Sequence, residues 1–108
     1  ILLIKTTYDY GYSLPGGGIK KNEDPLDAAK REALEEVGIV LNDATLITSF
    51  VTKAEYKIDT VYGFYAEVSS KKYTLDKLEI ERAEWHPIKD LPKLGPVTQK
   101  IIDAYIHK

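Results

Sequence analysis

The sequence predicts an α/β domain in which β-strands are packed between two helices. Four segments are expected to form strands: 1–5, 44–56, 58–68 and 82–88. Two of them, 44–56 and 58–68, are rich in Val, Ile, Tyr, Phe and Thr, as strands are. Two further segments, one after Asp24 and one after Gly95, place apolar residues at the spacing of a helical face. A chain of 108 residues is long enough for a single core. We therefore expect residues 1–108 to form one domain.

The first strand, Ile1–Lys5, leads into a tyrosine-rich loop. Tyr8, Tyr10 and Tyr12 alternate in this loop. Alternating aromatic residues suit a plain strand or hairpin, and they also suit stacking on a nucleobase. Both interpretations stay open, with Tyr8 the candidate for contact with a base.

The helix that follows Asp24 has clear signals at both ends. Asp24 is a good N-cap, and Pro25 suits the first helical position. Gly38 stands where a glycine in the left-handed conformation commonly ends a helix. A rotation of about 100° per residue puts four apolar residues on one stripe, with Leu34 at its edge: Leu26, Ala29, Ala33 and Val37. We expect this stripe to pack on a sheet.

Three glutamates share a separate face of the same helix, beside the apolar stripe. Glu32, Glu35 and Glu36 stand at helical spacing, and each like-charged pair there costs roughly 0.2–0.5 kcal/mol. Glu35 and Glu36 also lie in the last turn, where the helix dipole disfavours negative charge. Arg31 flanks the cluster. A bound divalent cation is the simplest ligand that would make this face favourable.

A glycine-rich stretch, Gly16–Gly18, precedes the helix and lets the backbone approach a ligand or metal ion. Gly17 is followed after five residues by Glu23. After seven more residues comes the run Arg31-Glu32-Ala33-Leu34-Glu35-Glu36-Val37-Gly38-Ile39. This pattern resembles the signature of the Nudix hydrolase superfamily. Every charged and glycine position of that signature is filled, and the one departure is the small Ala33 at a position for a bulky aliphatic residue.

The resemblance implies the Nudix fold, a mixed β-sheet in an α/β/α sandwich. The rest of the chain suits it, with a polar loop at 69–78, a strand at 82–88 and a closing helix that begins at Gly95-Pro96. The apolar side of that helix is expected to comprise Val97, Ile101, Ile102, Tyr105 and Ile106. Members of the superfamily usually have another strand before this point, so we expect this chain to lack the N-terminal strand of the fold.

The resemblance also implies a reaction, the hydrolysis of the diphosphate linkage of a nucleoside diphosphate joined to another group. Carboxylate oxygens favour Mg²⁺, or Mn²⁺, over zinc. By analogy with the superfamily, Glu32, Glu35 and Glu36 would bind the metal, with the backbone carbonyl of Gly17. Arg31 would orient its neighbouring glutamate, and Glu23 would support the site from behind. The glycines Gly16, Gly17 and Gly18, with Tyr8, would contact the substrate.

The general base has two candidates. In some members of the superfamily it is the equivalent of Glu32, and in others it is a glutamate from a loop far along the chain. Glu79 is the best-placed residue of the second kind, with Glu55 and Glu81 behind it. A solvated surface carboxylate is the alternative role for Glu79.

The amino-acid composition limits the classes of partner that we expect this chain to bind. The net charge of −2 argues against a broad nucleic-acid or anionic-membrane surface. The absence of cysteine excludes disulfides and thiolate metal sites and is compatible with a cytoplasmic protein. We expect a small nucleotide substrate and no membrane partner. Nucleic acid is expected only as a capped or triphosphate RNA end, and pairing with a second copy of the chain stays open.

A second class of function stays open as well. A Nudix domain can lose catalysis and serve as a nucleotide-binding or regulatory module. Loss of the motif glutamates would favour that fate, and here none is lost. The sequence therefore favours the enzyme. It does not choose among nucleoside triphosphates, dinucleoside polyphosphates, nucleotide sugars and capped RNA ends.

Overall fold

The structure is a computed structural model that describes residues 1–7, 11–54, 57–76 and 78–108. Its elements follow in chain order: β1 (Leu2–Thr6), α1 (Pro25–Val37), β2 (Thr45–Ala54), β3 (Lys57–Tyr65), β4 (Ile80–Trp85) and α2 (Pro96–Ile106). Tyr8, Tyr10 and Glu55, which the sequence singled out, lie outside the described residues. Neither helix in the described part of the chain is long and apolar enough to cross a membrane.

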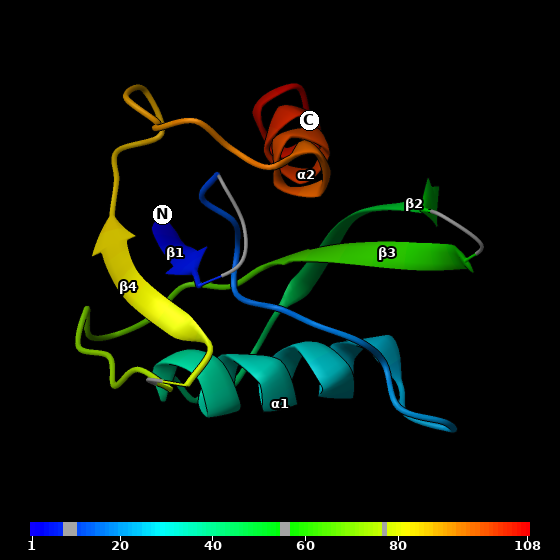
Figure 1. The fold of residues 1–108 in the computed structure, drawn as a ribbon, viewed down its shortest axis with the longest axis horizontal. Coiled ribbons are helices and arrows are strands. Elements are labelled where there is room, and N and C mark those ends of the chain that lie inside the picture. The colour runs from blue at the N-terminus through cyan, green and yellow to red at the C-terminus, as the bar shows by residue number, and fades with distance from the viewer. Residues whose placement is uncertain (8–10, 55–56, 77) are drawn as a thin grey trace.

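The strands form two antiparallel pairs with a helix on either side (Figure 1). β1 pairs with β4 from Leu2↔Trp85 to Thr6↔Ile80, and β2 pairs with β3 along their length. An isolated bridge between Tyr12 and Leu94 is parallel, so both directions of strand pairing occur in the described chain. The predicted α/β class is confirmed.

The last strand differs from its prediction. It spans Ile80–Trp85 and not 82–88. Ile80 is only 2% exposed, and burying such a side chain contributes about 1.5–3 kcal/mol, so the strand begins where Ile80 enters the core. Pro87 has no N–H group and cannot extend the ladder. Glu79 therefore lies immediately before the strand.

Helix α1 has the predicted ends. The Asp24 side chain accepts a hydrogen bond from the Leu26 N–H at 3.0 Å. Gly38 adopts φ 67° and its N–H donates to the Leu34 carbonyl at 3.0 Å. These are the N-cap and the left-handed C-terminal glycine that the local sequence indicates.

The buried face of α1 differs from the predicted stripe. Ala33 and Val37 are buried as expected, but Leu26 and Ala29 are only half-buried. The helix is rotated so that Ala28 and Glu36 also face inward. Glu36 therefore does not share one open face with the other glutamates.

The core fixes the C-terminal end of α1 against the β1–β4 pair. It comprises Leu2, Ile4, Val37, Ile80 and Ala83, with Ile39, Leu75 and Trp85 packed against them. Helix α2 packs on the other strand pair, where a Cβ on Gly63 would lie 2.8 Å from the Ile101 side chain. Of the apolar side predicted for α2, Ile101 and Ile102 are buried, whereas the remaining three residues are exposed.

Candidate active site

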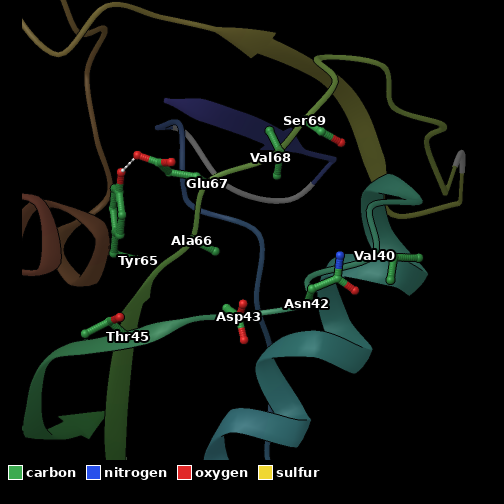
Figure 2. A pocket seen from close by; sticks show the side chains of 9 residues that line it. All are labelled: Val40, Asn42, Asp43, Thr45, Tyr65, Ala66, Glu67, Val68 and Ser69. Carbon is green, nitrogen blue, oxygen red and sulfur yellow. Dashed lines mark hydrogen bonds between the residues drawn. The ribbon is translucent and has the colours of Figure 1, made fainter.

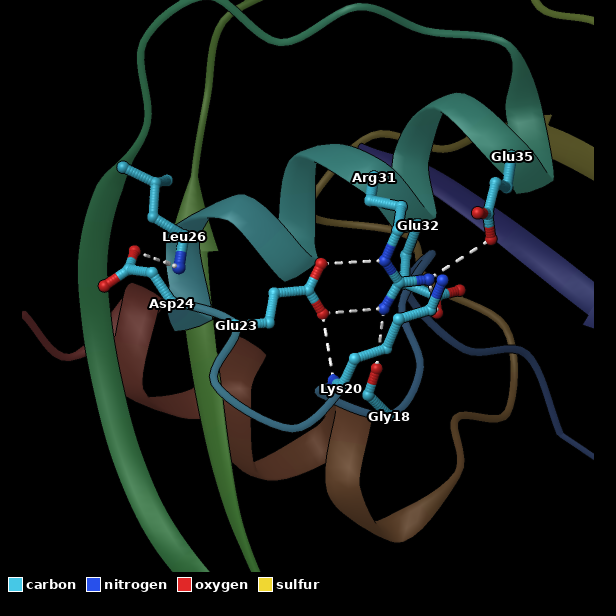
Figure 3. A network of polar contacts seen from close by, with 8 residues as sticks. All are labelled: Gly18, Lys20, Glu23, Asp24, Leu26, Arg31, Glu32 and Glu35. Carbon is cyan, nitrogen blue, oxygen red and sulfur yellow. Dashed lines mark hydrogen bonds and ion pairs between the residues drawn. The ribbon is translucent and has the colours of Figure 1, made fainter.

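Arg31 is the centre of a network that joins the acidic helix to the glycine loop (Figure 3). Its Nε and Nη2 donate to the two carboxylate oxygens of Glu23 at 2.8 and 3.0 Å. Its Nη1 donates to Glu32 at 2.8 Å and to Glu35 at 3.3 Å. Its Nη2 also donates to the Gly18 carbonyl at 2.9 Å. The paired bonds to Glu23 are the geometry in which arginine binds carboxylates most firmly.

A tight turn brings Glu23 to Arg31. The Glu23 N–H donates to the Lys20 carbonyl at 3.0 Å, and the Lys20 N–H donates to the Glu23 side chain at 2.9 Å. Asn22 supplies the positive φ, 65°, that its side chain tolerates. The Arg31 hydrogen bonds and the Lys20 amide lower the pKa of Glu23 to about 2, so Glu23 carries a full negative charge near neutral pH.

Among the three loop glycines, Gly17 is the one whose backbone leaves no room for a side chain. A Cβ on Gly17 would lie 2.7 Å from the carboxylate of Glu32, whereas Cβ atoms on Gly16 and Gly18 would meet nothing within 4 Å. The backbone at Gly17 therefore packs directly on the Glu32 carboxylate. Any larger residue at position 17 would displace that carboxylate.

Glu36 lies one turn after Glu32 in very different surroundings. It is 7% exposed, and the Gly16 N–H donates to its carboxylate at 2.7 Å. Burial, with repulsion from the charges of Glu32, Glu79 and Asp76, raises the pKa of Glu36 to about 7, and the Gly16 bond opposes the rise only in part. The site therefore contains a buried carboxylate that needs a positive partner.

The structure brings Glu79 and Asp76, which are far from α1 in the sequence, close to Glu36. Glu79 is exposed, directly before β4, and its charge acts on Glu36. Asp76 acts on Glu36 in the same way, and its N–H donates to the Glu36 carbonyl at 3.0 Å. The sequence analysis missed Asp76. The signal available was a short polar turn just before the core residue Ile80.

The donor set of this region fits a hard divalent cation. Carboxylate oxygens of Glu32 and Glu36 and the backbone of Gly17 lie together, and oxygen ligands of this kind suit Mg²⁺. Among the residues that the structure describes, no three acidic or histidine side chains stand ready to hold a metal ion. Glu35 is bonded to Arg31 and is 54% exposed.

A separate pocket of about 420 Å³ lies between the segment after α1 and the end of β3 (Figure 2). Asn42, Asp43, Tyr65 and Glu67 are among its lining residues, and the Tyr65 hydroxyl donates to Glu67 at 2.8 Å. None of the predicted site residues lines this pocket. The pocket is therefore separate from the acidic cluster on α1.

Comparisons with known proteins agree with the fold. The NUDIX domain family model matches residues 1–105, and the chain belongs to this family. The resemblance drawn from the motif Gly17–Ile39 is therefore confirmed.

Particular relatives are similar over most of this chain. The m7GpppN-mRNA hydrolase of Saccharomyces cerevisiae (strain ATCC 204508 / S288c) is 33% identical over 97 residues, which is 86% of this chain and 10% of that protein. The NAD-capped RNA hydrolase NudC of Haemophilus influenzae (strain PittGG) is 29% identical over 100 residues, which is 89% of this chain and 37% of NudC. The chain thus spans a minor part of the length of these relatives.

A solved structure supports the same fold. The MutT NUDIX hydrolase from Burkholderia pseudomallei superposes with a TM-score of 0.85 at 27% identity, over 95% of this chain and 85% of that one. The two chains therefore share nearly the whole architecture.

Proposed function

We propose that this chain is a Mg²⁺-dependent pyrophosphohydrolase that cleaves the diphosphate linkage of a nucleoside diphosphate derivative. One observation carries the proposal. Glu32 and Glu36 stand one turn apart against the backbone of Gly16 and Gly17, and Arg31 is bonded to Glu32 from the other side. Family membership of the chain supports the same reaction class.

Each residue of the site has a role in the proposed reaction. Glu32, Glu36 and the Gly17 carbonyl would hold the cation, and Glu35 would join them once it leaves Arg31. Bound Mg²⁺ neutralises phosphate charge and lowers the pKa of a bound water. Arg31 holds Glu32 in orientation through the 2.8 Å bond. Glu32 and Glu79 are the two candidates for the base that takes the proton from the attacking water.

The substrate is proposed at the level of a class, a nucleotide that contains a diphosphate linkage. Both curated relatives carry names that describe hydrolysis of RNA ends. Those names place capped RNA ends in the panel of substrates beside nucleoside triphosphates, dinucleoside polyphosphates and nucleotide sugars. Because the relatives are much longer than this chain, the panel must be tested in full.

The test is turnover of that panel with Mg²⁺ and with EDTA, by the native protein and by Glu32→Gln. We expect Mg²⁺-dependent release of a phosphate-containing product, and a loss of roughly 10²–10³-fold in Glu32→Gln. Glu67→Gln is the matched control, because Glu67 is an exposed glutamate in the separate pocket. Ligand binding without turnover of any member of the panel would support the binding-module alternative and overturn the proposal.

A further inference from the structure

The end of α1 that carries Glu36 is bonded to a segment far along the chain. α1 has no basic residue in its last turn, and the last carbonyl groups of a helix have no partner inside it. The Thr74 N–H donates to the Val37 carbonyl at 2.9 Å, and the Asp76 N–H donates to the Glu36 carbonyl at 3.0 Å. Thr74 and Asp76 therefore complete the helix at the residue whose side chain accepts from Gly16.

This contact is close as well as hydrogen-bonded. A Cβ on Gly38 would lie 3.2 Å from the side chain of Thr74. Gly38 therefore ends the helix and also leaves room for the segment that docks on it. The same glycine serves both purposes because it has a positive φ and no side chain.

Asp76 also shapes the turn that leads to Glu79. Its side chain accepts a hydrogen bond from the Leu78 N–H at 3.1 Å, the pattern of an Asx-turn. Its carbonyl accepts from the Ile80 N–H at 2.9 Å. Ile80 lies in the same core cluster as Val37. The turn is thus anchored to the helix at one end and to the core at the other.

Glu79 lies inside this anchored turn. Its carbonyl accepts from the Thr7 N–H at 3.1 Å, just after β1, and its side chain is exposed. Backbone bonds thus tie the turn to Thr7 after β1 and to Glu36 in α1. The place of the Glu79 carboxylate relative to Glu36 therefore depends on the geometry that Asp76 imposes.

We propose that Asp76 is a positioning residue of the active site, whose acceptor oxygen and bond to the Glu36 carbonyl hold the Glu79 carboxylate in register with Glu36. The inference rests on the proposed function and adds the element that joins the helix carboxylates to the loop carboxylate. The group that acts is the acceptor oxygen of Asp76 and not its charge. Asn in its place, which accepts the same hydrogen bond, therefore preserves the effect.

The first test compares variants of this acceptor by steady-state kinetics. Asp76→Ala removes the acceptor and is expected to lower kcat roughly 10-fold with KM changed less than about 2-fold. Asp76→Asn keeps the acceptor and is expected to stay within about 2-fold of the native kcat. Ser70→Ala is the matched control, because it removes a similar side-chain bond to the Lys72 N–H in the same loop without touching the helix. A native kcat in Asp76→Ala, or an equal loss in Asp76→Asn, would overturn the inference.

A double-mutant cycle with Glu79→Gln separates positioning from a merely structural role. If Asp76 acts through Glu79, Asp76→Ala adds no further loss of kcat in the Glu79→Gln background. If the double variant loses kcat by the product of the two single losses, the inference is overturned. A native kcat in Glu79→Gln overturns it too, because Glu79 would then have no catalytic work for Asp76 to support.

Two further variants keep the outcome decisive. If Asp76→Ala does not fold, Leu78→Pro removes the same hydrogen bond from the donor side, at a residue that is 89% exposed. It is expected to lower kcat as Asp76→Ala would, and a native kcat would overturn the inference. Glu32→Gln distinguishes the two proposals: activity lost there but retained in the Asp76 variants leaves the proposed function standing and removes only the positioning role.

Discussion

Glu23 and Glu36 belong to one sequence motif, yet they lie in opposite electrostatic surroundings. Glu23 receives paired hydrogen bonds from Arg31 and another from the Lys20 N–H, and its pKa falls to about 2. Glu36 is buried beside other negative charges, and its pKa rises to about 7 although the Gly16 N–H donates to it. The same side chain is thus stabilised as an anion at one place and destabilised as an anion at the other.

The difference teaches which half of the site is complete without a ligand. Arg31 compensates the charge of Glu23, and its bond to the Gly18 carbonyl ties the glycine loop to the helix without a ligand. Glu36 is instead buried beside other negative charges, and burial of an uncompensated carboxylate costs free energy of folding. A domain retains such a residue where a cation bound there repays the cost, which is the stability–function trade-off expected of active sites.

The variant Glu36→Gln tests this comparison with the largest expected effects on turnover and stability. The amide oxygen still accepts from Gly16, but the charge is gone. We expect turnover to fall roughly 10²–10³-fold. In metal-free buffer at pH 8, the free energy of unfolding should rise by on the order of 1–3 kcal/mol, because a buried charge has been removed. Turnover assays and urea unfolding measure the two effects.

Glu23→Gln is the control for Glu36→Gln, since it removes a charge that Arg31 already compensates. We expect it to lower the free energy of unfolding, opposite in sign to Glu36→Gln. If both variants were destabilised alike, the contrast between the two carboxylates would be wrong.

A smaller effect is expected where Glu32 meets the glycine loop. Gly17→Ala puts a methyl group where the Glu32 carboxylate now lies, 2.7 Å away. The far end of a flexible side chain can move cheaply, so we expect the free energy of unfolding to change by less than about 1 kcal/mol. Turnover should fall about 10-fold, because the carboxylate is misplaced. Native turnover in Gly17→Ala would refute the contact.

The sequence predicted the parts of the fold whose signals are local. The ends of α1 follow from Asp24, Pro25 and Gly38, and the structure has them where the sequence indicates. The start of β4 depends on the pairing of Ile80 with Thr6. These two residues are far apart in the sequence, so no local pattern predicts their pairing.

The same distinction explains the site. The spacing of Arg31, Glu32 and Glu23 predicted residues that the structure does bring together. The buried face of α1 was assigned from apolar residues alone, so the charged Glu36 was placed outside it although the structure buries it. The proposed role of Asp76 rests on a backbone bond to Glu36 that only the folded chain creates. Contacts of this kind are set by tertiary packing.

The last expected effect concerns stability alone, and it is a change in the shape of the pH–stability curve. Between pH 2 and 4.5 the unfolded chain holds the proton of Glu23 while the folded chain does not, so Glu23 makes stability rise with pH. Between pH 4.5 and 7 the folded chain holds the proton of Glu36 while the unfolded chain has lost it, so Glu36 makes stability fall as pH rises. Urea unfolding in EDTA across this range should show the fall in the native protein and not in Glu36→Gln. Parallel curves for the two proteins between pH 4.5 and 7 would mean that Glu36 carries its charge in the folded state without cost, and the contrast with Glu23 would be lost.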